Sequence, residues 1–136
     1  MPFTEGRPYG EAGNHKVLIV MTDGANTYVS RNNMNRSQYM AFNYITHGYL
    51  GTTSTNNDTV VSAMNDRTIE ACENVQATSQ ITVYTIAFQL EDADAEAILE
   101  GCASDPTKAF DAGNSDELIG AFRLIAQDIA TLRIAE

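Results

Sequence analysis

The strongest constraint on the fold is a run of five apolar residues, 17–21, that ends at Thr22, Asp23 and Gly24. A short unbroken apolar run predicts a strand buried on both faces, as in a parallel sheet, and Gly24 permits a sharp turn after it. In open α/β sheets the carboxyl ends of the strands form the ligand crevice. Asp23 is therefore placed either to hold a divalent cation through oxygen or to cap the next segment.

Strand and helix patterns alternate along the rest of the chain. Asp58 and Asn114 are predicted helix N-caps, and Glu117, three residues after Asn114, is able to reach back as a capping box. The alternation indicates right-handed crossovers, so we expect one α/β domain in which a parallel sheet of about three strands is flanked by helices. The predicted strands are 17–21, 81–88 and 109–111, and the predicted helices are 58–76, 92–101 and the segment from 114 onward.

Each predicted helix carries apolar residues at three- and four-residue steps, the spacing of a buried helical face. These residues define the expected core beneath the helices. They are Val61, Met64, Thr68, Cys72 and Val75 in the first helix, Ala95, Ile98, Leu99 and Cys102 in the second, and Leu118, Phe122, Ile125, Ile129 and Leu132 in the third.

The length of 136 residues fits a single domain, which begins with a Gly-, Pro- and Glu-rich approach loop at 1–15. The net charge of −10 argues against nucleic acid or an anionic membrane surface as partner, because each requires a basic footprint. No run approaches the ~20 apolar residues that span a bilayer, and the polar start is not a signal peptide. We expect either a cytoplasmic chain or a targeting segment outside this sequence.

A long polar insertion at 25–57 is rich in Asn, Thr, Ser and Tyr and contains no acidic residue. Its part 37–49 is predicted to form a helix. Loops of this length in compact domains are often functional, and Tyr and Arg are favoured at protein interfaces. The insertion is therefore either a protein contact or an inert surface loop. The candidate contact residues are Tyr28, Arg31, Arg36, Tyr39, Tyr44 and Tyr49.

The two cysteines, Cys72 and Cys102, flank the central predicted strand. Helices on the same face would bring them together in a disulfide, which would stabilise the fold by roughly 3–4 kcal/mol and indicate a location outside the cytosol. Two buried, reduced cysteines are the alternative. With the distant His15 and His47, the cysteines match no zinc-site spacing.

Residues 16–27, Lys-Val-Leu-Ile-Val-Met-Thr-Asp-Gly-Ala-Asn-Thr, resemble the fourth strand and following loop of a von Willebrand factor A domain. More narrowly, the whole chain resembles the C-terminal part of TadG-like proteins of the Tad (Flp) pilus-assembly system. That match also includes Pro-Phe-Thr-Glu at 2–5, Ile-Thr-Val-Tyr-Thr-Ile-Ala-Phe at 81–88, Leu-Glu-Gly-Cys-Ala-Ser at 99–104 and the apolar C-terminal pattern at 110–134. The resemblance implies a partial, Rossmann-like von Willebrand factor A domain with three layers. The insertion is its least matched part.

The resemblance also implies what this sequence lacks. The metal-ion-dependent adhesion site of the family draws on three loops, and Asp23, with Thr22 and Gly24 shaping its turn, matches the third. The Asp-x-Ser-x-Ser of the first loop is absent, and nothing before residue 16 supplies the second. We expect no metal cofactor in this chain at physiological levels, and Mg²⁺ or Mn²⁺ only in a complete domain, because one carboxylate does not satisfy a six-oxygen shell.

TadG-like proteins are typically anchored by an N-terminal transmembrane helix, with the A domain outside the cytoplasm. The resemblance thus favours the Cys72–Cys102 disulfide, a periplasmic or cell-surface location, and an anchoring segment that lies upstream of this sequence. In the family the fourth strand pairs with the first, which has no counterpart here. Strand 17–21 would then present an open apolar edge, so we expect homo-oligomers formed by strand pairing or exchange of elements.

The function that the resemblance implies is non-enzymatic: an adhesion or assembly domain that binds a protein partner, such as pilus or secretion components. One alternative is a metal-dependent phosphoesterase or sulfatase, which also places Asp-Gly at a strand end, with Thr27 as nucleophile. Such enzymes usually require two metals and a cluster of Asp and His ligands, and this sequence has two histidines in polar loops. A purely structural interaction module is the other alternative.

Overall fold

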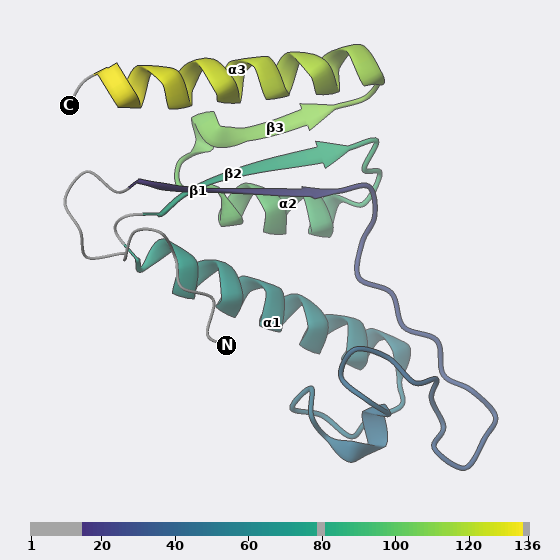
Figure 1. Ribbon diagram of the computed structural model, residues 1–136. Coiled ribbons are helices and arrows are strands. Elements are labelled where there is room, and N and C mark those ends of the chain that lie inside the picture. Colours follow the sequence, from purple (N-terminus) through teal and green to yellow (C-terminus); the bar gives the residue numbers. More distant parts are fainter. Residues whose placement is uncertain (1–14, 79–80, 135–136) are drawn as a thin grey trace, which may run out of the picture.

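The computed structural model (Figure 1) describes residues 15–78 and 81–134, so the predicted approach loop lies outside this part except for His15. Three parallel strands form one sheet in the order β1-β2-β3, which confirms the α/β fold with a three-stranded parallel sheet. The elements are β1 (Lys16–Thr22), α1 (Asn57–Gln76), β2 (Ile81–Phe88), α2 (Ala93–Cys102), β3 (Ala109–Ala112) and α3 (Ser115–Ile134), with short 3₁₀ helices at Ile45–His47 and Pro106–Lys108.

The helices cover the two faces of the sheet in separate layers, with α1 and α2 on one face and α3 on the other (Figure 1). Successive side chains of a strand point to opposite faces. On the α3 side, Tyr84 and Ile86 of β2 pack with Ala121 and Ile125 of α3. Val83 is also buried and belongs to the face beneath α1 and α2. The central strand is therefore the part of the sheet that the described residues cover on both faces.

The predicted start of the first helix was wrong by two residues. The amide oxygen of Asn56 accepts the Thr59 N–H at 3.0 Å, which makes Asn56 the N-cap of α1. Asp58, the predicted cap, lies instead in the first turn. A carboxylate in the first turn is favourable beside the positive end of the helix dipole. Asp58 therefore does mark the start of the helix, but as a first-turn residue rather than as the cap.

The predicted cap of the last helix is confirmed. The Asn114 side chain accepts the backbone N–H groups of Asp116 and Glu117, both at 3.0 Å. Glu117 also reaches back, but its carboxylate accepts the N–H of Gly113 at 2.7 Å and the side-chain amide of Asn114. The reciprocal bond of the capping box thus falls one residue earlier than expected.

Strand β1 is not buried on both faces, which corrects the expectation from its apolar run. Ile19 and Met21 are 39% and 51% exposed. Within the described part of the chain β1 pairs with β2 alone, and its register places Ile19 beside Tyr84 and Met21 beside Ile86. Helix α3 packs against β3 and β2. The α3 side of β1 is therefore left largely uncovered by the residues described.

The predicted helix at 37–49 is also wrong. One 3₁₀ turn, Ile45–His47, forms within it. Asn43 and Gly48 have positive φ angles of 67° and 76°, a conformation that interrupts a right-handed helix and that Asn and Gly adopt most readily. The tyrosines that suggested the helix recur at five-residue steps. Residues that are neighbours on one face of a helix are three or four positions apart.

The insertion instead folds around a small core of its own. Tyr28, Ile45 and Leu50 are buried together with Val60 of α1. In Figure 1 the insertion lies at the first turns of α1, away from the three strands. Its conformation is thus set by packing onto one helix end rather than by the sheet.

The apolar stripes of the helices were predicted in outline. Leu99, Cys102 and Ile125 are buried as expected, whereas Phe122 is 42% exposed and Ala121 occupies the buried position beside it. The Leu132 side chain lies outside the described part. Among the described residues, no helix has the length and apolar character needed to cross a membrane.

Candidate functional site

The Thr-Asp-Gly turn lies at the carboxyl end of β1, as predicted. The Thr22 hydroxyl donates to the Gly24 carbonyl at 2.9 Å and accepts the Gly24 N–H at 3.3 Å, which closes the turn. The Asp23 side chain is exposed. A hollow of about 150 Å³ beside the turn is lined by Thr22, Gly24 and Asn26 together with residues of α1 and α2. Asp23 therefore stands at the expected edge of the sheet without lining this hollow.

The residues around this turn do not fit a magnesium site. Mg²⁺ requires about six oxygen ligands in near-octahedral geometry and is usually held by one or more carboxylates. In residues 15–78 and 81–134, no three His, Cys, Asp or Glu side chains gather closely enough to hold a metal ion. Asn26 and Asn65, which line the hollow beside the turn, are joined by a hydrogen bond of 2.9 Å. A metal role for Asp23 in a complete domain therefore stays a prediction.

The most developed surface feature is a row of four aromatic rings on the insertion, formed by Tyr39, Tyr44, His47 and Tyr49. Ring centroids are 5.5 Å apart between Tyr39 and Tyr44, 5.7 Å between Tyr44 and His47, and 6.3 Å between His47 and Tyr49. Each pair is edge-to-face, a favoured arrangement for aromatic rings. Tyr39 and Tyr49, at the two ends, are 71% and 67% exposed. We call these four residues the aromatic row.

The row contains one residue that is not among the contact residues predicted from the sequence. His47 lies between Tyr44 and Tyr49 and contacts both rings. Tyr28, in contrast, is 5% exposed and does not reach this surface. Its hydroxyl donates to the Arg36 carbonyl at 3.3 Å, so Tyr28 supports the insertion from within.

The two arginines of the insertion flank an exposed methionine. Arg31 and Arg36 lie at the ends of a tight loop closed by Arg31 N–H to Arg36 carbonyl and Arg36 N–H to Asn33 carbonyl hydrogen bonds of 3.4 and 3.0 Å. Met34, near its tip, is 100% exposed. Residues 31–36, which we call the Met34 loop, thus present an apolar side chain between two cations.

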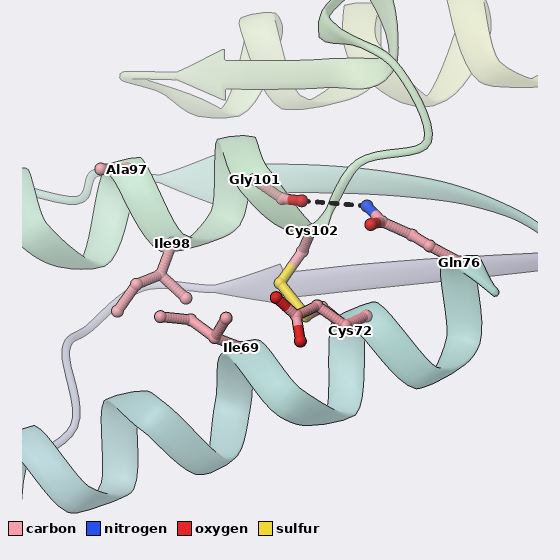
Figure 2. Close-up of a pocket in the computed structure, with 8 residues that line it drawn as sticks. Ile69, Cys72, Gln76, Ala97, Ile98, Gly101 and Cys102 are labelled. Atoms are coloured by element: carbon pink, nitrogen blue, oxygen red, sulfur yellow. Dashed lines mark hydrogen bonds between the residues drawn. A yellow bond between two sulfur atoms is a disulfide. The ribbon is translucent and has the colours of Figure 1, made fainter.

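The Cys72–Cys102 disulfide predicted through the family resemblance is present, with the two Cα atoms 5.0 Å apart. It joins α1 to α2 beside a groove of about 400 Å³ (Figure 2). Ile69 and Ile98 point toward one another across this groove, and Gln76 closes its end by donating to the Gly101 and Ala103 carbonyls, each at 2.9 Å. We call it the disulfide groove.

A polar network on the α3 side was not anticipated from the sequence. Tyr84 is buried, and its hydroxyl donates to Asp128 of α3 at 2.6 Å. Lys108 lies 3.2 Å from the same carboxylate and 3.4 Å from Asp105. The only sequence signal was a carboxylate at position 128, between the apolar positions 125 and 129.

This network shifts the pKa values of its members. Burial raises the pKa of the Tyr84 phenol, and the hydrogen bond to Asp128 adds to the effect. The same hydrogen bond lowers the pKa of Asp128, with a further contribution from Lys108. Burial opposes the charge of Lys108, but its hydrogen bonds to Asp128 and Asp105 prevail and raise its pKa. The pairing therefore favours a neutral phenol, an ionised carboxylate and a charged ammonium.

Comparison of the chain with models of protein families, with curated proteins and with solved structures found no match. Membership of the von Willebrand factor A family therefore stays a prediction from the sequence resemblance.

Proposed function

We propose that this chain is a non-enzymatic protein-binding domain of the adhesion or assembly type. The observation that carries this proposal is the aromatic row, because its end members are both more than two thirds exposed. Tyrosine offers a large contact area with few rotatable bonds and a polar tip, and it is enriched at the centres of protein interfaces. An exposed row of such rings is typical of a recognition surface.

The composition of the insertion supports the same conclusion. It holds four of the six tyrosines of the chain, together with abundant Asn, Ser and Thr and two arginines. Antibody loops combine rigid Tyr anchors with adaptable Ser, Gly and Asn contacts and place Arg at energetically important positions. Tyr28, Ile45 and Leu50 pack with Val60 and so attach the insertion to α1. Such restraint before binding lowers the entropy cost of binding.

We place this activity in a Tad (Flp) pilus-assembly or surface-adherence protein, outside the cytoplasm. The Cys72–Cys102 disulfide supports an oxidising compartment. In a complete domain, Asp23 would contribute to a Mg²⁺ site that adds to the contact. The partner would be a pilus or secretion component.

Site-specific photo-crosslinking in the source organism tests the proposal. A photoreactive phenylalanine analogue replaces Tyr39 in one strain and Leu124, an exposed residue of α3, in a control strain. We expect one protein to be crosslinked at Tyr39 but not at Leu124, and Tyr49→Ser in the Tyr39-labelled chain to reduce the yield. Equal products at both positions would contradict the proposal.

The phosphoesterase or sulfatase alternative is tested separately with p-nitrophenyl phosphate and p-nitrophenyl sulfate in the presence of Mn²⁺. Turnover that is lost in both Asp23→Ala and Thr27→Ala would favour that enzyme over a binding domain. Under our proposal, the purified chain hydrolyses neither compound above the rate of a heat-denatured sample.

A further inference from the structure

We propose that copies of this chain associate head to tail, with the Met34 loop of one copy seated in the disulfide groove of the next. This goes beyond binding through the aromatic row, because it uses two other surfaces and names a second copy of the chain as the partner. The two surfaces complement each other in polarity and charge.

The groove offers an apolar site of suitable size. Its volume of about 400 Å³ lies within the range of small-ligand sites, so it has room for one unbranched side chain and adjoining backbone. Ile69, Ala97 and Ile98 line it beside the disulfide. Ile69 is 41% exposed, and Figure 2 shows its side chain pointing toward Ile98 rather than away from the groove.

The loop offers a matching side chain. Met34 is completely exposed, although methionine is apolar. Its unbranched, polarizable side chain adapts to irregular apolar sites. The hydrogen bonds between Arg31 and Arg36 and between Arg36 and Asn33 already hold the loop closed, so seating it requires little further ordering of the backbone.

Charge complementarity supports a second copy as the partner. The Met34 loop carries two arginines and no acid, whereas one carboxylate, Glu73, lines the groove itself. The two helices that form the groove carry several further acids and a single arginine, Arg67, which is paired with Glu70 at 2.7 Å. The insertion at 25–57 holds two basic residues and no acidic one, which leaves six basic and 18 acidic residues elsewhere. The acids of these helices are Asp58, Asp66, Glu70 and Glu73 of α1 and Asp94, Glu96 and Glu100 of α2.

The two surfaces of one molecule do not meet each other. The insertion packs against Val60 near the start of α1, and the groove begins at Ile69 and includes Cys72 and Gln76 near its end. Twelve residues of helix separate Val60 from Cys72, a rise of about 18 Å. Figure 1 shows the insertion beyond the first turns of α1. The Met34 loop therefore does not occupy the groove of its own chain, and the groove that it can occupy belongs to another copy.

Contact between two different surfaces is heterologous, so each copy retains a free loop or a free groove for the next. The product is an open chain of copies rather than a closed dimer. One loop in one groove buries less surface than a standard stable interface, which places the contact among weak associations. It should weaken further as salt screens the arginines from the helix acids.

Methyl NMR tests the proposal directly. The labelled sample is isoleucine-labelled chain carrying Met34→Asp, which keeps the groove but lacks the apolar side chain of the Met34 loop. Unlabelled wild-type chain is titrated into it. We expect the methyl signals of Ile69 and Ile98 to shift and saturate. Ile19 of β1 serves as an internal reporter, because strand pairing at the sheet edge would shift Ile19 instead.

Two variants of the unlabelled chain complete the test. Unlabelled Met34→Asp chain should shift Ile69 and Ile98 at least tenfold less at equal concentration, whereas the matched surface variant Leu124→Asp should act like wild type. Labelled Ala97→Arg chain, with a cation in the groove at an exposed position, should not respond to wild type. The proposal is overturned if Ile69 and Ile98 stay unchanged up to the solubility limit, or if Met34→Asp shifts them as strongly as wild type.

Discussion

The phenol of Tyr84 in β2 donates a 2.6 Å hydrogen bond to the carboxylate of Asp128 in α3. This polar link crosses an interface at which apolar residues also pack, among them Ile86 of the strand and Ile125 of the helix. Lys108 lies over the Tyr84 ring at 5.4 Å and also reaches Asp128. The link thus fixes how α3 sits along the sheet, a choice that non-directional apolar packing leaves less defined.

Replacing Tyr84 with Phe removes this link while keeping the ring. We expect the free energy of unfolding to fall by about 1 kcal/mol, the value for an ordinary intramolecular hydrogen bond, because water can solvate the partly exposed Asp128 carboxylate once the phenol is gone. Urea denaturation followed by circular dichroism measures the change. Tyr39→Phe, which removes an exposed phenol, should leave the midpoint unchanged. Equal midpoints for Tyr84→Phe and wild type would show that the bond does not stabilise the fold.

The Asp128 carboxylate predicts a loss of stability in acid. Its pKa is lowered in the folded protein, first by the hydrogen bond from Tyr84, so its contribution is complete above the ordinary carboxyl pKa of 3.8 and declines as the pH falls through the lower folded value. Asp105, whose pKa is lowered chiefly by Thr107, acts in the same direction. Melting temperatures between pH 6 and pH 2 should fall less steeply in Asp128→Asn than in wild type. Parallel curves would contradict this.

The Cys72–Cys102 bridge closes a loop of 30 residues, which predicts a stabilisation of roughly 3–4 kcal/mol in the chain-entropy model. Cys72→Ser/Cys102→Ser should lose about this much in urea denaturation, and a reductant should destabilise wild type but not the double variant. Thiol titration of the denatured, unreduced protein should find no free thiol. Two free thiols would contradict the bridge.

Asp23 alone predicts no useful affinity for divalent cations, because one carboxylate leaves most of the Mg²⁺ shell to water. Calorimetric titration of Mg²⁺ or Mn²⁺ into the chain should give heats of dilution in the submillimolar range. The Asp23→Ala variant should give the same trace. A saturable signal in wild type that disappears in Asp23→Ala would assign this chain a metal site of its own.

The edge of β1 predicts a second route to self-association. Ile19 and Met21 are substantially exposed on this strand, and apolar edge strands tend to pair with other chains. The Met34→Asp variant lacks the side chain needed for the loop-in-groove contact, so light scattering on this variant reports edge pairing alone. The average mass of the variant should exceed that of a monomer at high concentration. Adding Ile19→Lys should return the mass to that of a monomer. A monomeric Met34→Asp chain at all concentrations would exclude edge pairing.

Periodicity in the sequence was enough to predict the sheet and its helices. The apolar residues of 81–88 and of the helices that contain Leu99 and Ile125 pack mainly against one another, so the pattern of each segment matches its burial. It failed for residues 17–21. Their apolar run predicts a strand, but burial depends on which neighbours cover it. It failed again at 37–49, where the spacing of the tyrosines suggested a helix. Positive φ angles at Asn43 and Gly48 interrupt the backbone there, so no long helix forms.

The candidate surface was anticipated by residue type rather than by geometry. Tyrosine and arginine were selected because of their interface preference. This selection included the exposed Tyr39 and Tyr49 but also the buried Tyr28. His47 and Met34 were missed because neither residue signals exposure on its own. Their positions follow from how the insertion turns over its small core, and a long loop has no periodic pattern from which to read that path.

The core of Tyr28, Ile45, Leu50 and Val60 has a consequence for how this chain can diversify. It is separate from the core around Tyr84 and Ile125, so the exposed positions between its members can vary without disturbing the sheet. Related chains would then retain the same scaffold while replacing the residues at positions 39, 44, 47 and 49. Under the proposed function, the insertion would be a segment in which new binding preferences can evolve while the sheet and its helices stay unchanged.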